Sequence, residues 1–432
     1  MLLADTSPLS VAPPAAAPRS ATPPGAVAVI ADDAQALDTA RRLAADFATT
    51  AVERDRDRRL PWDELDAFSG SGLWAITVPR AHGGAGVCGA TLADVIARVS
   101  AADGSLGQIP QNHFYAVELL RLAGSAEQQR FFYGRVLAGE RLGNALAEIG
   151  HKDFKRRTRI EPAADGGFRL QGRKFYCTGA LYAHWIPTMA VAQETAPDGT
   201  VREAPHLVFV PRHAPGVQVI DDWDGFGQRV TGSGSVVLDD VRIEPGWVLR
   251  LPDGLEQTST ARPFAHLMHS AIDLGIGRGA LAATLDVVRD HARPWIDAKV
   301  ARAADDPLLL QQIGDTAVRL RAAEALVRRA ARLLDAAQAA PTPERVAAAS
   351  VAVSEARVLT TTASLDAGTR LFELGGTAAT LDGRGLDRFW RNARTHTLHD
   401  PVRWRYHAVG DYHLNGRHPA LQPPATPAAA AS

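Results

Sequence analysis

The sequence has 432 residues, of which 46% are hydrophobic, and a formal net charge of -1. This length predicts two or three packed domains, and the balanced charge gives no electrostatic basis for binding nucleic acid or an anionic membrane. The sequence contains no run of about 18 apolar residues, so it predicts no membrane span. The two cysteines, Cys88 and Cys177, form neither a CxxC pair nor a disulfide framework, so we expect reduced thiols in a cytoplasmic protein.

The N-terminal part of the chain combines a tail with a helical pattern. Residues 1–27 are rich in proline and alanine and predict a disordered tail. Over residues 28–143, apolar residues recur at three- and four-residue spacings. One such stripe is formed by Leu92, Val95, Ile96 and Val99. We therefore expect an N-terminal helical domain.

The pattern changes twice along the remaining chain. Residues 144–255 contain short β-branched runs, HLVFVP, GVQVI and SVVLDDVRI, bounded by Gly, Pro and Asp. Helical periodicity returns over residues 256–418, and residues 419–432 predict a second disordered tail. Helices followed by strands and then by long helices predict an α+β fold with segregated layers.

The β region contains residue types that suit a flat cofactor. It opens at Asn144, and the segment 172–180 contains Tyr176 and Thr178. An aromatic ring can cover one face of a flavin, and a hydroxyl can hydrogen bond to its polar edge. The alternative is a strand with an ordinary buried aromatic residue.

A Gly/Ser-rich cluster at residues 221–235 contains Trp223 and Phe226. Its small residues and hydroxyls can line a cofactor or substrate edge. They can equally form an ordinary loop.

Near the C-terminus, His396, His399 and Asp400 lie within five residues. Such a group can perform acid–base chemistry. The HxxH spacing also occurs in metal sites, but no third ligand is evident, so we expect no metal. A structural role at a helix end is the other alternative.

Taken in this order, the motifs resemble the acyl-CoA dehydrogenase superfamily over roughly residues 31–414. The resemblance implies an N-terminal helical domain, a central β-barrel-like domain and a C-terminal four-helix bundle, with a homotetramer as the usual assembly. By position, Tyr176 would lie beside the flavin ring and Thr178 near its N5 edge. The other residues that the resemblance implies for cofactor binding are Asn144, Arg293, Arg370, Gly375 and Gly376.

The size of the cofactor is indicated by one departure from the family pattern. Arg293 is followed by Pro294 and Trp295, where many dehydrogenases have Arg-x-x-Phe-Gly to support the FAD pyrophosphate and adenine. The loss of Phe-Gly favours the shorter cofactor FMN, with FAD as the alternative.

Two further departures point away from dehydrogenation. The usual catalytic glutamate is replaced by His399-Asp400, and the other position used in the family, near Ala265, has no carboxylate. Abstraction of an α-proton from a thioester requires such a base. The segment RNARTHTLHDP is instead similar to the flavin-dependent monooxygenase branch that includes dibenzothiophene monooxygenase. SLGQIPQNHF and DDWDGFGQR resemble the SfnB-type sulfur-acquisition oxidoreductases.

This branch implies a reaction of reduced flavin and dioxygen with a small organosulfur substrate. Because we find no nicotinamide-binding fingerprint, a separate flavin reductase is expected to supply reduced flavin. His399 would lie over the flavin as a catalytic residue, with Asp400 orienting it. The residues expected to line the substrate pocket are His113, His184, Trp185, Trp223 and Phe226. Asn112 lies on the same helix as His113, and a role in the core is the alternative for both.

Two other functions stay open from the sequence. One is an acyl-CoA dehydrogenase that uses Asp400 as a displaced base. The other is a non-catalytic binding protein that has kept the fold.

Overall fold

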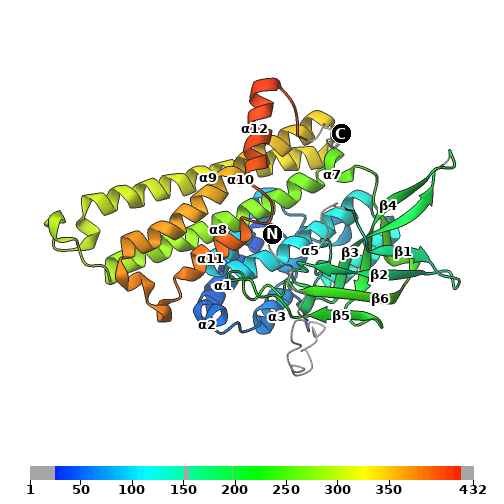
Figure 1. Cartoon of the computed structure of the whole chain (residues 1–432), viewed down its shortest axis with the longest axis horizontal. Coiled ribbons are helices and arrows are strands. Elements are labelled where there is room, and N and C mark those ends of the chain that lie inside the picture. Colours follow the sequence, from blue (N-terminus) through cyan, green and yellow to red (C-terminus); the bar gives the residue numbers. More distant parts are fainter. Residues whose placement is uncertain (1–24, 150–154, 197, 420–432) are drawn as a thin grey trace, which may run out of the picture.

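The computed structural model describes residues 25–149, 155–196 and 198–419. N-terminal helices, a central sheet and a layer of long C-terminal helices follow one another along the chain (Figure 1). The tails predicted over 1–27 and 419–432 lie outside the described residues, apart from 25–27 and 419. None of the helices in the described ranges is both long and apolar enough to cross a membrane.

The N-terminal part is helical, as the periodicity predicted. Its elements are α1 (Asp33–Ala48), α2 (Ala51–Arg56), α3 (Trp62–Gly70), η1 (Leu73–Ala75), η2 (Arg80–His82), α4 (Gly89–Ala102), α5 (Gly104–Ala123) and α6 (Ala126–Leu137). The side chain of Asp103 caps α5 by accepting hydrogen bonds from the backbone N–H groups of Ser105 and Leu106. Most residues of α5 are buried, so this helix carries polar side chains into the centre of the molecule.

The central part is one sheet of seven strands in the order β5-β6-β2-β1-β3-β4-β7. Its elements are β1 (Arg159–Pro162), β2 (Phe168–Phe175), η3 (Ala180–Tyr182), β3 (Trp185–Thr195), β4 (Val201–Pro211), β5 (Val217–Ile220), β6 (Ser235–Ile243), η4 (Pro245–Trp247) and β7 (Val248–Arg250). β1 pairs with β3 in parallel and the other neighbours pair antiparallel. The central β domain is therefore an open mixed sheet with β5 and β7 at its edges, where the sequence predicted a barrel-like one.

The C-terminal part is built on three long helices, α8, α9 and α10. Its elements are α7 (Leu255–Thr258), α8 (Ala261–Asp290), η5 (Ile296–Ala298), η6 (Ala303–Asp305), α9 (Pro307–Ala339), α10 (Pro343–Gly375), η7 (Thr377–Thr380), η8 (Asp382–Arg384), α11 (Asp387–His396) and α12 (Arg403–Asn415). α4 packs on α8 and α9, so the N-terminal part supplies the fourth long neighbour of the bundle. Small residues allow the close packing: a Cβ on Gly277 would lie 3.1 Å from Ser364 Cα across the α8–α10 contact.

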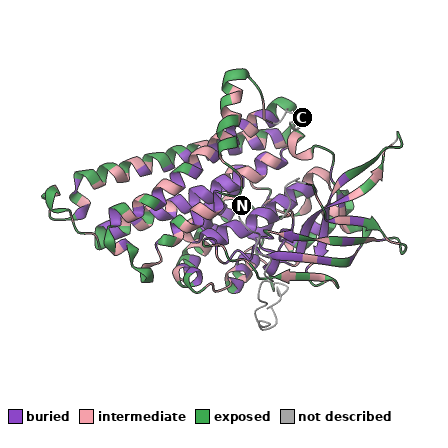
Figure 2. Cartoon of the chain, viewed as in Figure 1, coloured by how far each residue is buried: buried purple, intermediate pink, exposed green. Residues whose placement is uncertain are grey.

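One continuous hydrophobic core links the helical parts to the sheet, including Trp74 of η1, Phe209 of β4 and Leu267 of α8. Figure 2 shows the buried residues concentrated where these parts meet, while α12 and the outer face of α9 are largely exposed. The order of elements follows the predicted division. The predicted boundary at 143/144 falls between α6 and β1, whereas the one at 255/256 falls after the first residue of α7. These boundaries stay predictions, since the parts share this core.

Candidate active site

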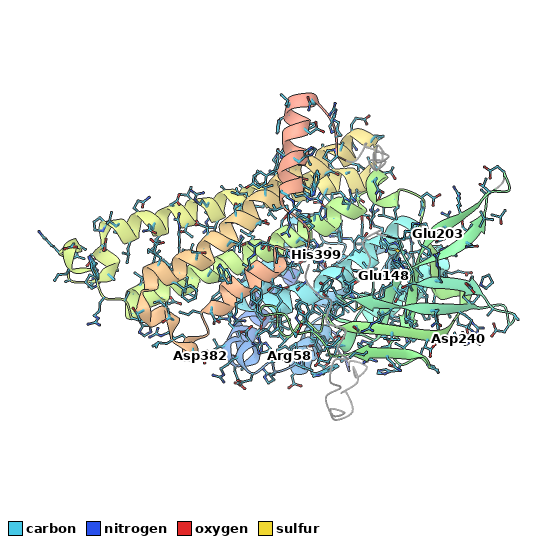
Figure 3. All side chains as sticks on the ribbon, in the orientation of Figure 1. Arg58, Glu148, Glu203, Asp240, Asp382 and His399 are labelled. Atoms are coloured by element: carbon cyan, nitrogen blue, oxygen red, sulfur yellow. The ribbon has the colours of Figure 1, made fainter. Side chains whose placement is uncertain are left out.

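A cavity of about 450 Å³ lies where α5, the sheet and the C-terminal end of α11 meet. Figure 3 labels His399 at this junction, with Glu148 toward the sheet. The described lining residues are Gln108, Asn112, Asn144, Leu146, Ala147, Tyr176, Thr178, Trp223, Gly225, Phe226, Gln228, Ser233, Thr395, His396, Leu398 and His399. Among them there is no aspartate or glutamate. A larger open groove of about 820 Å³ runs along α1 and contains none of the predicted site residues.

The aromatic wall of the cavity is held by Asn144. Tyr176 follows β2 with a φ of 64°, a left-handed conformation that is uncommon for a residue other than glycine. Asn144 Nδ2 donates to the Tyr176 carbonyl at 3.1 Å, while Asn144 Oδ1 accepts from the Leu146 N–H at 3.0 Å. The Tyr176 ring is 48% exposed and lines the cavity. Asn144 thus fixes the backbone from which this ring projects.

A chain of buried hydroxyls determines which hydrogen bonds Thr178 can make. Thr231 Oγ1 donates to the Gln228 carbonyl at 3.0 Å and lies 2.6 Å from Ser233 Oγ, which lies 2.8 Å from Thr178 Oγ1. Each hydroxyl has a single proton. Because the proton of Thr231 goes to a carbonyl, Ser233 must donate to Thr231 and Thr178 must donate to Ser233. Thr178 therefore presents only acceptor lone pairs to the cavity.

The loop that forms the opposite wall is held by α11. The Gln228 N–H donates to Asn392 Oδ1 at 2.6 Å, and Arg391 Nη1 donates to the Phe226 carbonyl at 2.8 Å. Between them, Gly227 packs so closely that a Cβ would lie 2.1 Å from the Arg391 carbonyl oxygen. A side chain at this position would push the Phe226 loop away from α11.

Behind the cavity, histidines of α8 and α11 meet a buried carboxylate. His396 Nδ1 lies 2.5 Å from Asp273 Oδ1, and His396 Nε2 lies 3.1 Å from His269 Nδ1. A carboxylate can only accept, so His396 donates through Nδ1. The second oxygen of Asp273 pairs with Arg357 and accepts from Thr361 Oγ1 at 3.1 Å.

The side chains of Asp273 and Arg357 are fully buried. Burial by itself would raise the pKa of Asp273, but Arg357, His396 and Thr361 together lower it below its usual value. Asp273 is therefore a carboxylate at neutral pH.

His399 faces the cavity and contacts His269, with ring centroids 4.1 Å apart and an interplanar angle of 47°. Protein surrounds the His399 ring, yet the ring remains accessible through the cavity. Burial, followed by the neighbouring His396 and Arg357, lowers the pKa of His399 to about 4. The ring is thus neutral near pH 7, with one N–H donor and one acceptor nitrogen.

Asp400 does not have the contacts that the sequence predicted. Its carboxylate accepts from Arg405 Nε at 2.9 Å and from Arg357 at 3.4 Å, and its pKa is about 2, because the arginines and His266 outweigh the effect of burial. The hydrogen bonds of Asp400 therefore go to arginines rather than to His399. The carboxylate that orients a histidine here is Asp273, which accepts a hydrogen bond from His396 Nδ1.

The structure brings some of the predicted site residues together at the cavity and places others in the core. Asn144, Tyr176, Thr178, Trp223, Phe226 and His399 line the cavity, as does Asn112. His113 instead accepts from the Leu142 N–H and contacts the Trp74 carbonyl on the other side of α5. His184 accepts from the Arg141 N–H, and Trp185 donates to Glu140 in the core.

The remaining predicted cofactor residues lie in another part of the bundle. Arg293 is exposed in the segment that follows α8, and Arg370 pairs with Asp315 and Asp366. Gly375 and Gly376 end α10. None of the four lines the cavity of its own chain, and Figure 3 shows the segment after α10, labelled at Asp382, well separated from His399.

His269, Asp273 and Arg357 belong to this site but were not predicted from the sequence. A usable signal was present, because His266, His269 and Asp273 are spaced three and four residues apart and so share one face of α8. Arg391 and Asn392 were seen only as part of a motif and not as the residues that hold the Phe226 loop.

Comparison with known proteins identifies the family. The N-terminal domain model of acyl-CoA dehydrogenases matches residues 31–140, and the C-terminal domain model matches residues 267–404. The chain belongs to the acyl-CoA dehydrogenase family, so the resemblance seen in the sequence is confirmed.

Two relatives that match almost the whole chain are named as monooxygenases. Dibenzothiophene monooxygenase of Rhodococcus erythropolis is 36% identical over 401 residues, covering 90% of this chain and 95% of the relative. The probable FMNH2-dependent monooxygenase SfnC of Pseudomonas putida is 33% identical over 89% of this chain and 96% of the relative.

Two solved structures extend the similarity to the fold. FMN-bound TdsC from Paenibacillus sp. A11-2 matches with a TM-score of 0.84 and 34% identity, covering 90% of this chain and 99% of TdsC. Methanesulfinate monooxygenase MsuC from Pseudomonas fluorescens matches with a TM-score of 0.79 and 31% identity, covering 88% and 97%.

The cavity fits the flavin that this family implies. Gln108 Oε1, Asn112 Nδ2 and Thr395 Oγ1 are buried polar atoms of the lining that have no hydrogen-bond partner within the described protein. Buried polar groups are normally paired, so these atoms are suited to a polar ligand. Tyr176 and Leu146 offer apolar surface beside them. A flat heterocycle with polar edges meets both requirements.

Proposed function

We propose that this protein is a flavin-dependent monooxygenase that uses FMN to oxygenate a small organosulfur compound. The observation that carries the proposal is the cavity lining: histidines, hydroxyls and aromatic rings converge there, and the described lining contains no carboxylate. Oxygenation needs hydrogen-bond donors beside the reacting oxygen, whereas dehydrogenation of a thioester needs a carboxylate base.

Different residues of the chain would bind the flavin and take part in the chemistry. Tyr176 would cover the flavin ring, and Gln108 and Asn112 would pair with its polar edges. When bound, reduced FMN supplies the two electrons that activate dioxygen. Thr178 offers an acceptor, which suits the N–H at the edge of a reduced flavin better than the bare nitrogen of an oxidised one. The neutral ring of His399 would donate a hydrogen bond to the reacting oxygen.

The cavity size and the similar proteins support the substrate class. A volume of about 450 Å³ lies toward the lower end of the roughly 300–1,000 Å³ of ligand pockets. Both the flavin ring and the substrate must share it, which favours a small substrate. Dibenzothiophene monooxygenase and methanesulfinate monooxygenase both act on organosulfur compounds by name.

A separate flavin reductase would supply reduced FMN, as the name of the FMNH2-dependent SfnC suggests. The described sheet is mixed and largely antiparallel, unlike the parallel sheet of dinucleotide-binding folds. Both cysteines are free, which agrees with a cytoplasmic location.

We also propose a homotetramer. Arg293, Gly375 and Gly376 can contribute to a flavin site only if another copy presents them to the cavity. Exposed apolar side chains on the bundle, such as Leu308, Val318 and Trp404, offer surface for that contact. Light scattering should report the mass of four chains, and a stable monomer at micromolar concentration would contradict the assembly.

The acyl-CoA dehydrogenase alternative fits the structure poorly. Asp400 does not line the cavity, and two arginines hold its pKa at about 2. A carboxylate so stabilised is a weak base. The direct test mixes the oxidised FMN enzyme anaerobically with butyryl-CoA. We expect no bleaching of the flavin absorbance, and rapid bleaching would overturn the monooxygenase proposal.

A further inference from the structure

The histidines behind the cavity form a continuous series from the cavity toward the outer side of the bundle. His399 lies at the cavity, and its ring contacts His269. The ring centroid of His269 lies 5.1 Å from that of His396 and 6.2 Å from that of His266. His266 borders a second cavity of about 20 Å³, lined also by Arg262 and Arg405. That volume is sufficient for one water molecule.

We propose that His399, His269 and His266, supported by His396 and Asp273, form a proton relay between the active-site cavity and this second cavity. The inference rests on the proposed function, because that reaction consumes a proton at the cavity.

The proton requirement follows from the balance of the reaction. Anionic reduced FMN, one proton, dioxygen and the sulfur compound give oxidised FMN, the S-oxygenated product and water. Two electrons pass from the flavin to dioxygen and two more come from the sulfur atom, which is oxidised. One oxygen atom forms the new S–O bond, and the other leaves as water. One proton per turnover must therefore reach the cavity from solvent.

The hydrogen bonds give the relay a direction. His396 donates Nδ1–H to Asp273, and in the uncharged form of His396 its Nε2 can only accept, from His269 Nδ1–H. The Nε2 of His269 is then an unprotonated acceptor. When this nitrogen takes up a proton, the charge can pass through Nδ1 to His396, where Asp273 stabilises it. Asp273 and His396 thus set the tautomer of His269 and make its Nε2 the exchanging atom.

The charges around the rings keep the relay neutral at rest. Asp273 is paired with Arg357, and Asp400 is paired with Arg405. Burial, together with the nearby histidines and arginines, lowers the pKa of His269 well below its usual value and that of His266 to about 3. The charged groups near the relay are Glu256 of α7, Asp273 and Arg262 of α8, Arg357 of α10, Asp400, and Arg405 of α12.

The spacing of the rings also suits transfer. His399 is free to turn because the cavity is open beside it, and such a turn can bring a nitrogen toward His269. The gap between His269 and His266 is wider, and of these two rings only His266 lines the water-sized cavity. Its polar lining, which includes Ser350 and Ser354, provides partners for a bridging water.

The test compares His269→Ala with a matched control, His206→Gln, which alters a buried histidine of β4 outside the relay. Anaerobic enzyme with bound reduced FMN is mixed with oxygen, without any sulfur compound, and flavin reoxidation is followed with and without added imidazole. General acid–base catalysis by a side chain contributes about 10²–10⁴-fold. We expect His269→Ala to slow the proton-dependent phase about 10²-fold, imidazole to restore it, and the control to match wild type. A wild-type rate in His269→Ala would overturn the relay.

A second measurement needs neither flavin nor turnover. The ¹⁵N resonances of histidine-labelled, flavin-free protein report which ring nitrogens carry protons. In wild type we expect the proton on Nδ1 at both His269 and His396. In Asp273→Asn we expect the proton of His396 on Nε2. Nε2–H tautomers at both rings in wild type would overturn the relay. If the wild-type protein binds no FMN, the proposed function fails, and this measurement still decides the relay.

Discussion

The Asp273–Arg357 pair allows a quantitative test of the structure at the candidate site. Replacing Asp273 with Asn removes the negative charge and keeps the shape of the side chain. Arg357, which is 0% exposed, would then retain only Asp400, at 3.4 Å. Removing one partner of a buried ion pair costs about 3–5 kcal/mol. Because Asp400 offsets part of this loss, we expect Asp273→Asn to lower the free energy of unfolding by about 3 kcal/mol.

Urea denaturation followed by tryptophan fluorescence measures this change. The matched control is Asp305→Asn, which breaks an exposed pair with Arg302, whose side chains are 45% and 73% exposed. Because solvent and salt screen such a surface pair, we expect this control to leave the free energy of unfolding nearly unchanged. If Asp273→Asn were no more destabilised than Asp305→Asn, the buried charge pair and the placement of His396 that depends on it would be refuted.

Three further outcomes follow from the same structure. His399→Ala should keep its affinity for FMN, but its rate of oxygen transfer should fall about 10²–10³-fold. The control His213→Ala, at an exposed histidine, should match wild type. If His399→Ala kept the wild-type coupling of flavin oxidation to product, His399 would be a structural residue. Thr178→Val should bring the Kd values for reduced and oxidised FMN closer together, because it removes the acceptor that favours reduced FMN. An unchanged ratio of the two Kd values would contradict the hydroxyl chain. The pKa of buried His113 is lowered to about 3, so its folded form binds fewer protons than the unfolded chain. Stability should therefore fall as pH drops from about 6.5 toward 3, by about 1.4 kcal/mol per pH unit. Equal unfolding free energies at pH 7 and pH 5 would contradict this.

The sequence predicted the fold and one wall of the site well. Helical and strand periodicities gave the order of the three parts, and family motifs placed Tyr176, Thr178 and His399 at what proves to be a single cavity. These residues come from segments more than 200 positions apart, so periodicity alone could not have joined them. The resemblance to known motifs supplied that information.

The residues that were misplaced share a physical reason. Adjacent side chains on a helix or at the start of a strand point in different directions. Asn112 therefore faces the cavity while neighbouring His113 points to the Trp74 carbonyl. Trp185 likewise turns into the core, where its ring packs on Phe132. A motif identifies a segment, but only the packing decides which of two neighbours reaches the ligand.

The supporting carboxylate was misassigned for a related reason. Asp400 is adjacent to His399 in sequence, whereas Asp273 lies 123 residues before His396. The short spacing between His399 and Asp400 therefore predicted the wrong partner. The contact between α8 and α11 that brings Asp273 to His396 depends on tertiary packing. The His-x-x-His-x-x-x-Asp spacing on α8 would have been the better guide.

The central claim is oxygen transfer from dioxygen to sulfur, and isotope labelling tests it most directly. Enzyme carrying reduced FMN is mixed with ¹⁸O₂ and methanesulfinate, and the product is analysed by mass spectrometry, with His399→Ala in parallel. The proposal predicts methanesulfonate containing one ¹⁸O atom, formed much faster by wild type than by the variant. A panel that includes a sulfone and a thioether covers the rest of the substrate class. Reoxidation of the flavin with no ¹⁸O in any sulfur product would contradict the claim.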